Sequence, residues 1–133
     1  MEQEKKLKIF TDLEKNITLM EKLYADCADV VKRRMAVGEN HFPVYIIYMD
    51  TMINRDLVET DIFKSLIYSL GPVPARGAVE YILDYGMITA DVARETDLNK
   101  ALKNMMSGDT LMFVDGADSV LVINSKGYPN RGV

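Results

Sequence analysis

The apolar run Val44–Asp50 (Val-Tyr-Ile-Ile-Tyr-Met-Asp) limits most strongly what this chain can fold into. It is rich in β-branched and aromatic residues, and Pro43 precedes it. A strand with one solvent-exposed face alternates polar and apolar residues, and this run does not. We therefore predict a central strand covered on both faces, the usual situation in α/β domains. Two later runs, Leu111–Val114 and Val120–Ile123, have the same character and are expected in the same sheet.

Composition narrows the class of protein. With 133 residues and 48% hydrophobic residues, the chain can bury the core of one domain but not of two large ones. A formal charge of −4 argues against nucleic acid as the main partner, because such binding depends on clustered Lys and Arg. The start of the chain is charged with both signs and no apolar segment follows, so no secretory signal is expected. Cys27 is the single cysteine, which fits a reducing compartment.

The first part of the chain is predicted to form a helix followed by an edge strand. Apolar residues at helical spacing predict an amphipathic helix over Lys6–Ala28. Its apolar stripe is expected either to cover the chain's own sheet or to bind a partner, and the short connection to Asp29 favours the own sheet. Val31–Val37 roughly alternates and contains three basic residues, which is typical of a protected edge strand.

The remaining segments complete a core of sheet and helices over residues 29–133. After the central strand we expect a helix capped by Asn54, a short helix over Ala78–Tyr85, a strand within Met87–Arg94, a helix capped by Thr96 or Asp97, and an antiparallel hairpin turning at Asp115–Asp118. The sequence therefore predicts one α/β domain spanning residues 1–133. Its sheet is expected to be mixed, with about five strands flanked by helices.

The residue types that perform catalysis are poorly represented. His41, the single histidine, lies in a polar loop with no cysteine or acid at metal-ligand spacing, so a solvated loop is favoured. Cys27 has no positive neighbourhood to activate a thiolate and is expected to serve packing. The glycines form neither a phosphate loop nor a dinucleotide fingerprint, and no serine has a nucleophile-elbow context. We expect no catalytic residues, no metal ligands, no cofactor and no enzyme activity.

Three aspartates are the candidates for binding a ligand. Asp50, Asp115 and Asp118 follow predicted strands, and open α/β sheets often bind ligands where strands end. Asp also caps helices and shapes turns, and both needs exist at these positions. From the sequence alone, both interpretations of these aspartates, ligand binding and local capping or turn formation, stay open.

Three segments, taken in order, carry a resemblance to a known family. They are Asp29–Arg34 (Asp-Val-Val-Lys-Arg-Arg), Tyr48–Asn54 (Tyr-Met-Asp-Thr-Met-Ile-Asn), and Ser107–Gly116 continuing to Gly127–Val133 (Gly-Tyr-Pro-Asn-Arg-Gly-Val). Together they resemble the amino-terminal soluble region, first subdomain, of the A subunit of bacterial spore germinant receptors, the GerA family. In that family a basic strand opening, a strand ending in Asp before a helix, and a Gly-containing hairpin occur in this order.

The sequence departs from the family pattern at two places. Thr51 stands where the family usually has Gly, so the turn after Asp50 is expected to be less tight. Val133 stands where the family continues into Glu-Pro and several membrane-spanning helices, which suggests a piece of a larger membrane protein.

The resemblance implies a non-enzymatic receptor component. Such a subdomain would contribute to assembly and signal transmission in nutrient-triggered spore germination, with the B and C subunits of the same receptor as partners and other A subunits as further candidates. The parent would lie in the inner spore membrane, with this domain on the cytoplasmic, spore-core side. The nutrient site of the family is usually assigned to the B subunit, so no ligand residues carry over. The alternative is a small-molecule-binding domain resembling the substrate-binding proteins of transporters.

Overall fold

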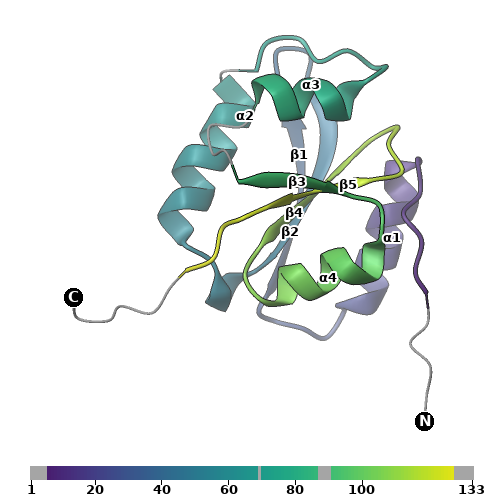
Figure 1. The fold of residues 1–133 in the computed structure, drawn as a ribbon, viewed down its shortest axis with the longest axis vertical. Coiled ribbons are helices and arrows are strands. Elements are labelled where there is room, and N and C mark those ends of the chain that lie inside the picture. Colours follow the sequence, from purple (N-terminus) through teal and green to yellow (C-terminus); the bar gives the residue numbers. More distant parts are fainter. Residues whose placement is uncertain (1–5, 69, 87–90, 128–133) are drawn as a thin grey trace.

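The fold is built on one five-stranded sheet. The computed structural model describes residues 6–68, 70–86 and 91–127 (Figure 1). The strands are β1 (Val30–Val37), β2 (Phe42–Met49), β3 (Val92–Glu95), β4 (Thr110–Val114) and β5 (Val120–Ile123), in the spatial order β1-β2-β4-β5-β3. The expected α/β class, the five strands and the hairpin of β4 with β5 are confirmed. All four strand pairings are antiparallel, where a mixed sheet was expected.

Helices cover both faces of this sheet. They are α1 (Leu13–Leu23), the short 3₁₀ turn η1 (Asp50–Met52), the π-helical segment η2 (Leu57–Phe63), α2 (Lys64–Tyr68), α3 (Ala78–Tyr85) and α4 (Leu98–Met106). One apolar cluster joins the sheet to α1 and α4, and a second joins it to η2, α2 and α3 (Figure 1). The chain therefore forms three layers, with the sheet in the middle.

The strand β2 divides its side chains between the two clusters. Ile46 and Tyr48 belong to the cluster under η2, α2 and α3, whereas Tyr45 and Ile47 belong to the cluster under α1 and α4. Residues 44–48 are all buried. Because side chains of a strand alternate between faces, an apolar run without alternation is what two covered faces require. The expected central strand is confirmed.

The first helix is shorter than expected: it begins at Leu13 rather than at Lys6 and ends at Leu23 rather than at Ala28. The Asp12 side chain accepts a hydrogen bond from the backbone N–H of Glu14 and caps the helix. The Asn16 amide bonds both the N–H and the carbonyl of Phe10, which fixes the preceding residues in an extended course. The spacing of the apolar residues before Asp12 predicted a helix there. The Asp12 cap and the hydrogen bonds of Asn16 instead make the helix begin only after Asp12.

The helix α1 packs on the chain's own sheet, as expected, and polar side chains tie it to β1. Lys32 lies 3.3 Å from a Glu21 carboxylate oxygen, and Arg34 donates two hydrogen bonds to Glu14. The Tyr45 hydroxyl donates to Glu21 over 3.2 Å. Burial, and then the nearby carboxylate, raise the pKa of Tyr45 well above its ordinary value. Two basic residues of this edge strand, Lys32 and Arg34, thus bind acidic side chains of α1.

The capping predictions for the later helices are confirmed. The Asn54 side chain accepts from the N–H of Leu57, and the Asp97 side chain accepts from the N–H of Lys100. Gly108 follows the C-cap of α4 with a φ of +117°, in the region that favours glycine. The expected strand of residues 87–94 begins at Val92, and its first part, residues 87–90, lies outside the described residues.

Replacing Val122 by Asp should unfold the domain. Val122 is 7% exposed, pairs with Leu111 and Ala93, and packs in the cluster under α1 and α4. An unpaired buried carboxylate costs more than about 4 kcal/mol, which approaches the whole stability of a small domain. Ala93→Asp is the matched control, because Ala93 lies opposite Val122 on the edge strand β3 but is exposed. Thermal unfolding checks both variants, and an unchanged melting temperature for Val122→Asp would contradict this packing.

Candidate functional site

The three candidate aspartates do not form one site. Val44 pairs with Val114 and Ile47 with Leu111, so the end of β2 lies beside the start of β4. Asp50 therefore lies at one end of the sheet and Asp115 at the other, roughly 20 Å apart at the rise of an extended strand. In a parallel sheet both strand ends would meet at the same edge. The antiparallel pairing separates them.

The carboxylate of Asp50 is held in a local turn. Both of its oxygens accept hydrogen bonds from Nη2 of Arg55, over 2.9 and 3.0 Å. Its backbone N–H donates to the carbonyl of Asp29 over 2.7 Å. These bonds fix the passage from β2 into η1, which agrees with the turn-shaping interpretation of this residue.

Asp115 and Asp118 share a small polar cavity of about 180 Å³. The cavity lies where the start of α3, the turn between β4 and β5, and the strand β3 meet. Its lining residues are Ala75, Gly77, Ala78, Val79, Glu80, Arg94, Asp115, Gly116, Ala117 and Asp118. The structure therefore brings together two of the three candidate residues and adds a cation, Arg94, that the sequence interpretation did not include.

Opposite charges lie side by side in this polar cavity. Arg94 forms an ion pair with Glu80, and its Nε donates to the Ser119 hydroxyl over 2.8 Å. A hydrogen bond from the backbone N–H of Glu80 itself, and then Arg94, lower the pKa of the Glu80 carboxyl. A cation beside carboxylates can orient a small polar molecule. It does not supply a nucleophile with an adjacent base.

Asp115 also has a structural role. Its Oδ1 accepts a hydrogen bond from the N–H of Leu13 over 3.1 Å, and the N–H of Gly116 donates to the carbonyl of Thr11 over 2.8 Å. Asp115 thus satisfies one of the first free N–H groups of α1, next to the cap that Asp12 provides. A negative charge at this end of a helix is also favoured by the helix dipole.

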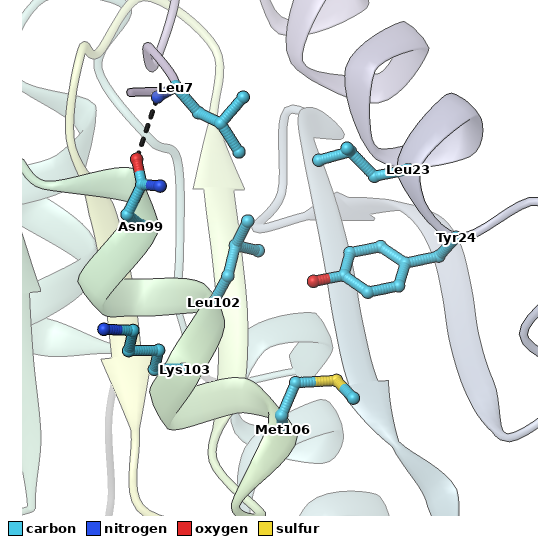
Figure 2. A pocket seen from close by; sticks show the side chains of 7 residues that line it. All are labelled: Leu7, Leu23, Tyr24, Asn99, Leu102, Lys103 and Met106. Atoms are coloured by element: carbon cyan, nitrogen blue, oxygen red, sulfur yellow. Dashed lines mark hydrogen bonds between the residues drawn. The ribbon is translucent and has the colours of Figure 1, made fainter. Parts of the chain in front are cut away.

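A larger apolar groove lies between α1 and α4 (Figure 2). It has a volume of about 540 Å³ and is lined by Leu7, Leu23, Tyr24, Asn99, Leu102, Lys103 and Met106. A hydrogen bond of 2.8 Å from the N–H of Leu7 to Oδ1 of Asn99 closes one end. Burial raises the pKa of the Tyr24 hydroxyl, with Cys27 as a second cause. The sequence interpretation missed this groove because its walls come from three separate segments, although it left open that the α1 stripe binds a partner.

Two of the segments that carry the family resemblance, Tyr48–Asn54 and the one that reaches Gly127, meet at one junction. The N–H of Asn54 donates to the carbonyl of Ser125, and the N–H of Gly127 donates to the carbonyl of Met52. A Cβ on Gly127 would lie 2.6 Å from the carbonyl oxygen of Ile53. The junction thus requires glycine at position 127 for a close backbone approach.

His41 is exposed and lies in a turn with a φ of +54°, as expected for a solvated loop. Cys27 is also exposed, so its expected packing role is wrong. Within residues 6–68, 70–86 and 91–127, no three His, Cys, Asp or Glu side chains are grouped so that they could hold a metal ion. Over the same described residues, no helix has the length and apolar character needed to cross a membrane.

Comparison with known proteins places the chain in a family. Residues 18–133 match the family described as Bacillus/Clostridium GerA spore germination protein. The fold and this match define a relative of germinant receptor subunits, and the chain belongs to the GerA family. It is 25% identical to spore germination protein KA of Bacillus subtilis over 133 residues, which are 99% of this chain and 24% of that protein.

Other relatives agree with this assignment. The chain is 23% identical to the uncharacterized membrane protein YfkQ of Bacillus subtilis, over 94% of this chain and 24% of that protein. It is 21% identical to spore germination protein GerLA of Bacillus cereus, over 79% of this chain and 21% of that protein. The chain therefore spans about a quarter of the length of these curated relatives.

The fold matches a solved receptor domain. The N-terminal domain of the A subunit of the Bacillus megaterium spore germinant receptor GerK3 superposes with a TM-score of 0.73 at 24% identity. The match covers 94% of this chain and 50% of that one. At this identity the likeness establishes the arrangement of sheet and helices.

Replacing Asp115 by Ala should destabilise the domain by about 1 kcal/mol, the usual cost of losing a side-chain acceptor at a helix start. Asp118→Ala is the control, because Asp118 is exposed in the same turn. Denaturant unfolding of both variants measures the difference. Equal effects of the two substitutions would show that the bond from Leu13 to Asp115 does not stabilise α1.

Proposed function

We propose that this chain is a non-enzymatic subdomain of a spore germinant receptor A subunit that contributes to receptor assembly and to signal transmission in nutrient-triggered germination. The family match over residues 18–133 carries this proposal. The printed names of two relatives, spore germination proteins KA and GerLA, support it.

The proposal includes the setting of the subdomain. Residues 1–133 form one domain of a longer membrane protein in the inner spore membrane, with this domain on the spore-core side. The B and C subunits of the same receptor are its partners, and other A subunits are further candidates. The chain spans about a quarter of the length of these relatives, which supports a longer parent protein. YfkQ is itself described as a membrane protein.

The junction at Gly127 supports a role in transmission. The backbone there is bonded to Met52 in η1, and Lys126 forms an isolated bridge with Ile53. The Lys126 ammonium also binds Oδ1 of Asp109 over 2.6 Å. A displacement of this segment would therefore move the turn that leads into η2 and α2.

Spores provide the direct test. In the source organism, with its other GerA-family receptors deleted, the full-length parent carrying Val122→Asp should lose germination in response to nutrients. Ala93→Asp at the paired, exposed position should retain it. Release of spore contents on nutrient addition is the measurement, and a non-nutrient trigger shows that the spores remain competent. A normal nutrient response over a broad panel in spores without the parent gene would refute the receptor role.

The alternative function, binding of a small molecule, is favoured by the polar cavity beside Arg94, Asp115 and Asp118. It predicts a stabilised domain in the presence of the right amino acid, sugar or nucleotide. A ligand at a hundred times its dissociation constant adds about 2.7 kcal/mol to the free energy of unfolding. Thermal melting against such a panel should show no shift for a pure interaction module. A shift that Asp118→Ala removes would favour the binding domain instead.

A further inference from the structure

We propose that the pair Asp115 and Gly116, in the turn between β4 and β5, is a site of isoaspartate formation, and that the start of α1 controls how fast the reaction proceeds there. The reaction needs only the chain itself and water. This modification site does not depend on the receptor role proposed above. It rests on the sequence of the turn and on the hydrogen bonds that hold it.

The turn contains the residue pair that is most open to this reaction. The chain has one Asp-Gly pair and no Asn-Gly pair. A backbone nitrogen that attacks the preceding side chain is least hindered when its own residue is glycine, which has no Cβ. Gly116 is exposed with a φ of +91°, and a Cβ built on it would meet nothing within 4 Å. The turn therefore has room for a ring to form and for water to reach it.

The modification consists of two steps. In the first, the backbone nitrogen of Gly116 attacks Cγ of the protonated Asp115 carboxyl. A C–N bond forms, the C–OH bond breaks, and the hydroxyl leaves with the amide proton as water. In the second step, water adds to the cyclic imide and opens the C–N bond on one side. Addition at Cγ restores aspartate, whereas addition at the backbone carbonyl carbon leaves Gly116 attached through the side chain, as isoaspartate.

The start of α1 holds both reacting groups in the folded chain (Figure 1). The N–H of Gly116 donates a hydrogen bond of 2.8 Å to the carbonyl of Thr11, and Oδ1 of Asp115 accepts one of 3.1 Å from the N–H of Leu13. The nitrogen attacks only after its amide leaves Thr11 and the carboxyl group leaves Leu13 and turns toward it. The two hydrogen bonds therefore oppose formation of the ring.

The segment Thr11–Leu13 is in turn fixed by buried neighbours. Leu13 is 4% exposed, and Asn16 is 1% exposed. The Asn16 side chain accepts from the N–H of Phe10 over 2.8 Å and donates to its carbonyl over 2.7 Å. Segments of a folded protein open locally with a free energy set by such contacts. Ring formation at Asp115 is therefore limited by local opening at the start of α1.

Isoaspartate would loosen the same part of the fold. It adds one carbon to the backbone of the turn and removes the side-chain carboxylate that accepts from Leu13. Because every residue of β4 and β5 is buried, a shift of these strands cannot absorb the longer turn without disturbing the core. The isomerised chain is therefore expected to melt at a lower temperature than the unmodified chain.

Ageing of the 133-residue chain in warm, neutral buffer made with heavy-oxygen water tests the proposal. Opening of the ring places heavy oxygen at Asp115, and trypsin releases residues 104–126 as one peptide in which mass spectrometry locates it. Methylation by an isoaspartyl methyltransferase counts the isoaspartate. A peptide of residues 110–123, which lacks α1, should react at least about tenfold faster than the folded chain. Asp118, which precedes Ser119 in the same turn, is the internal control.

Two substitutions at one position isolate the hydrogen bond from Leu13. Leu13→Pro removes the N–H that holds Asp115, at the first position of α1, where proline is well tolerated. Leu13→Ala is the matched control, because it also removes the buried side chain but keeps the N–H. Leu13→Pro should form the ring at least about tenfold faster than Leu13→Ala, as expected from losing a hydrogen bond to a charged group.

Two further variants complete the test. Asn16→Ala releases the residues before α1 without changing Leu13, so it should also form the ring faster than the unaltered chain, and it replaces Leu13→Pro if that variant does not fold. Asp115→Glu keeps a carboxylate but requires a larger ring that forms far more slowly. It should therefore give no isoaspartate at this position.

Four outcomes would overturn the proposal. Equal rates for Leu13→Pro and Leu13→Ala, or an unchanged rate for Asn16→Ala, would show that the start of α1 does not control the reaction. A folded chain that reacts as fast as the peptide would show that the fold gives no protection. Absence of heavy oxygen at Asp115 in the peptide would show that the pair is not a modification site. Equal labelling of Asp115 and Asp118 would assign the reaction to exposure of the turn rather than to the Asp-Gly pair.

Discussion

Burial of the central strands on both faces is the constraint on which the rest of the structure depends. Every residue of β4 and β5 is buried, and residues 44–48 of β2 are buried beside them. A sheet with two apolar faces must be covered twice, so α1 and α4 pack on one side and η2, α2 and α3 on the other. The two edge strands of the sheet are then β1 and β3, and their exposed residues are largely polar or small. The strands β4 and β5 are the last two along the described chain, yet both lie inside the sheet, between β2 and β3. The core is therefore completed only when the late hairpin inserts beside β2.

Much of this fold could be predicted from the sequence, and the failures have physical causes. Strands and caps follow local rules, so the central run, the Asn54 and Asp97 caps and the final hairpin were placed correctly. The start of α1 was wrong because the apolar spacing continues upstream of Asp12, whereas the side chain of Asn16 holds the residues before it out of the helix. Strand direction depends on how the strands pair across the whole sheet, and no single segment of the sequence specifies it. The interpretation of Asp50 and Asp115 as ligand-binding residues at strand ends depended on that direction, and so did the expected mixed sheet.

The candidate site illustrates the same limit. Asp115 and Asp118 were proposed as candidates because they follow predicted strands, but Arg94, which lines the same cavity, comes from β3, which is distant in sequence. The apolar groove requires residues from the segment before α1, from the end of α1 and from α4. Sequence periodicity identifies which face of a helix is apolar, but it does not say which part of that face the fold leaves open. Leu23 and Met106 are apolar residues of predicted helices that the packing does not cover.

The helix α4 connects the apolar groove with the junction at Gly127. Met106 forms part of the groove wall, and the next turn of the chain reaches the junction with Gly127 within two residues. At that point the N–H of Gly108 donates to Met105, and its carbonyl accepts a hydrogen bond from the buried Ser125 hydroxyl over 2.9 Å. A Cβ on Gly108 would lie 2.8 Å from the carbonyl oxygen of Met52, so the residue after the C-cap of α4 and the end of η1 are in close backbone contact. Packed backbone of this kind has little room to deform gradually. A displacement of α4 would therefore move Ser125 and the turn before η2 together.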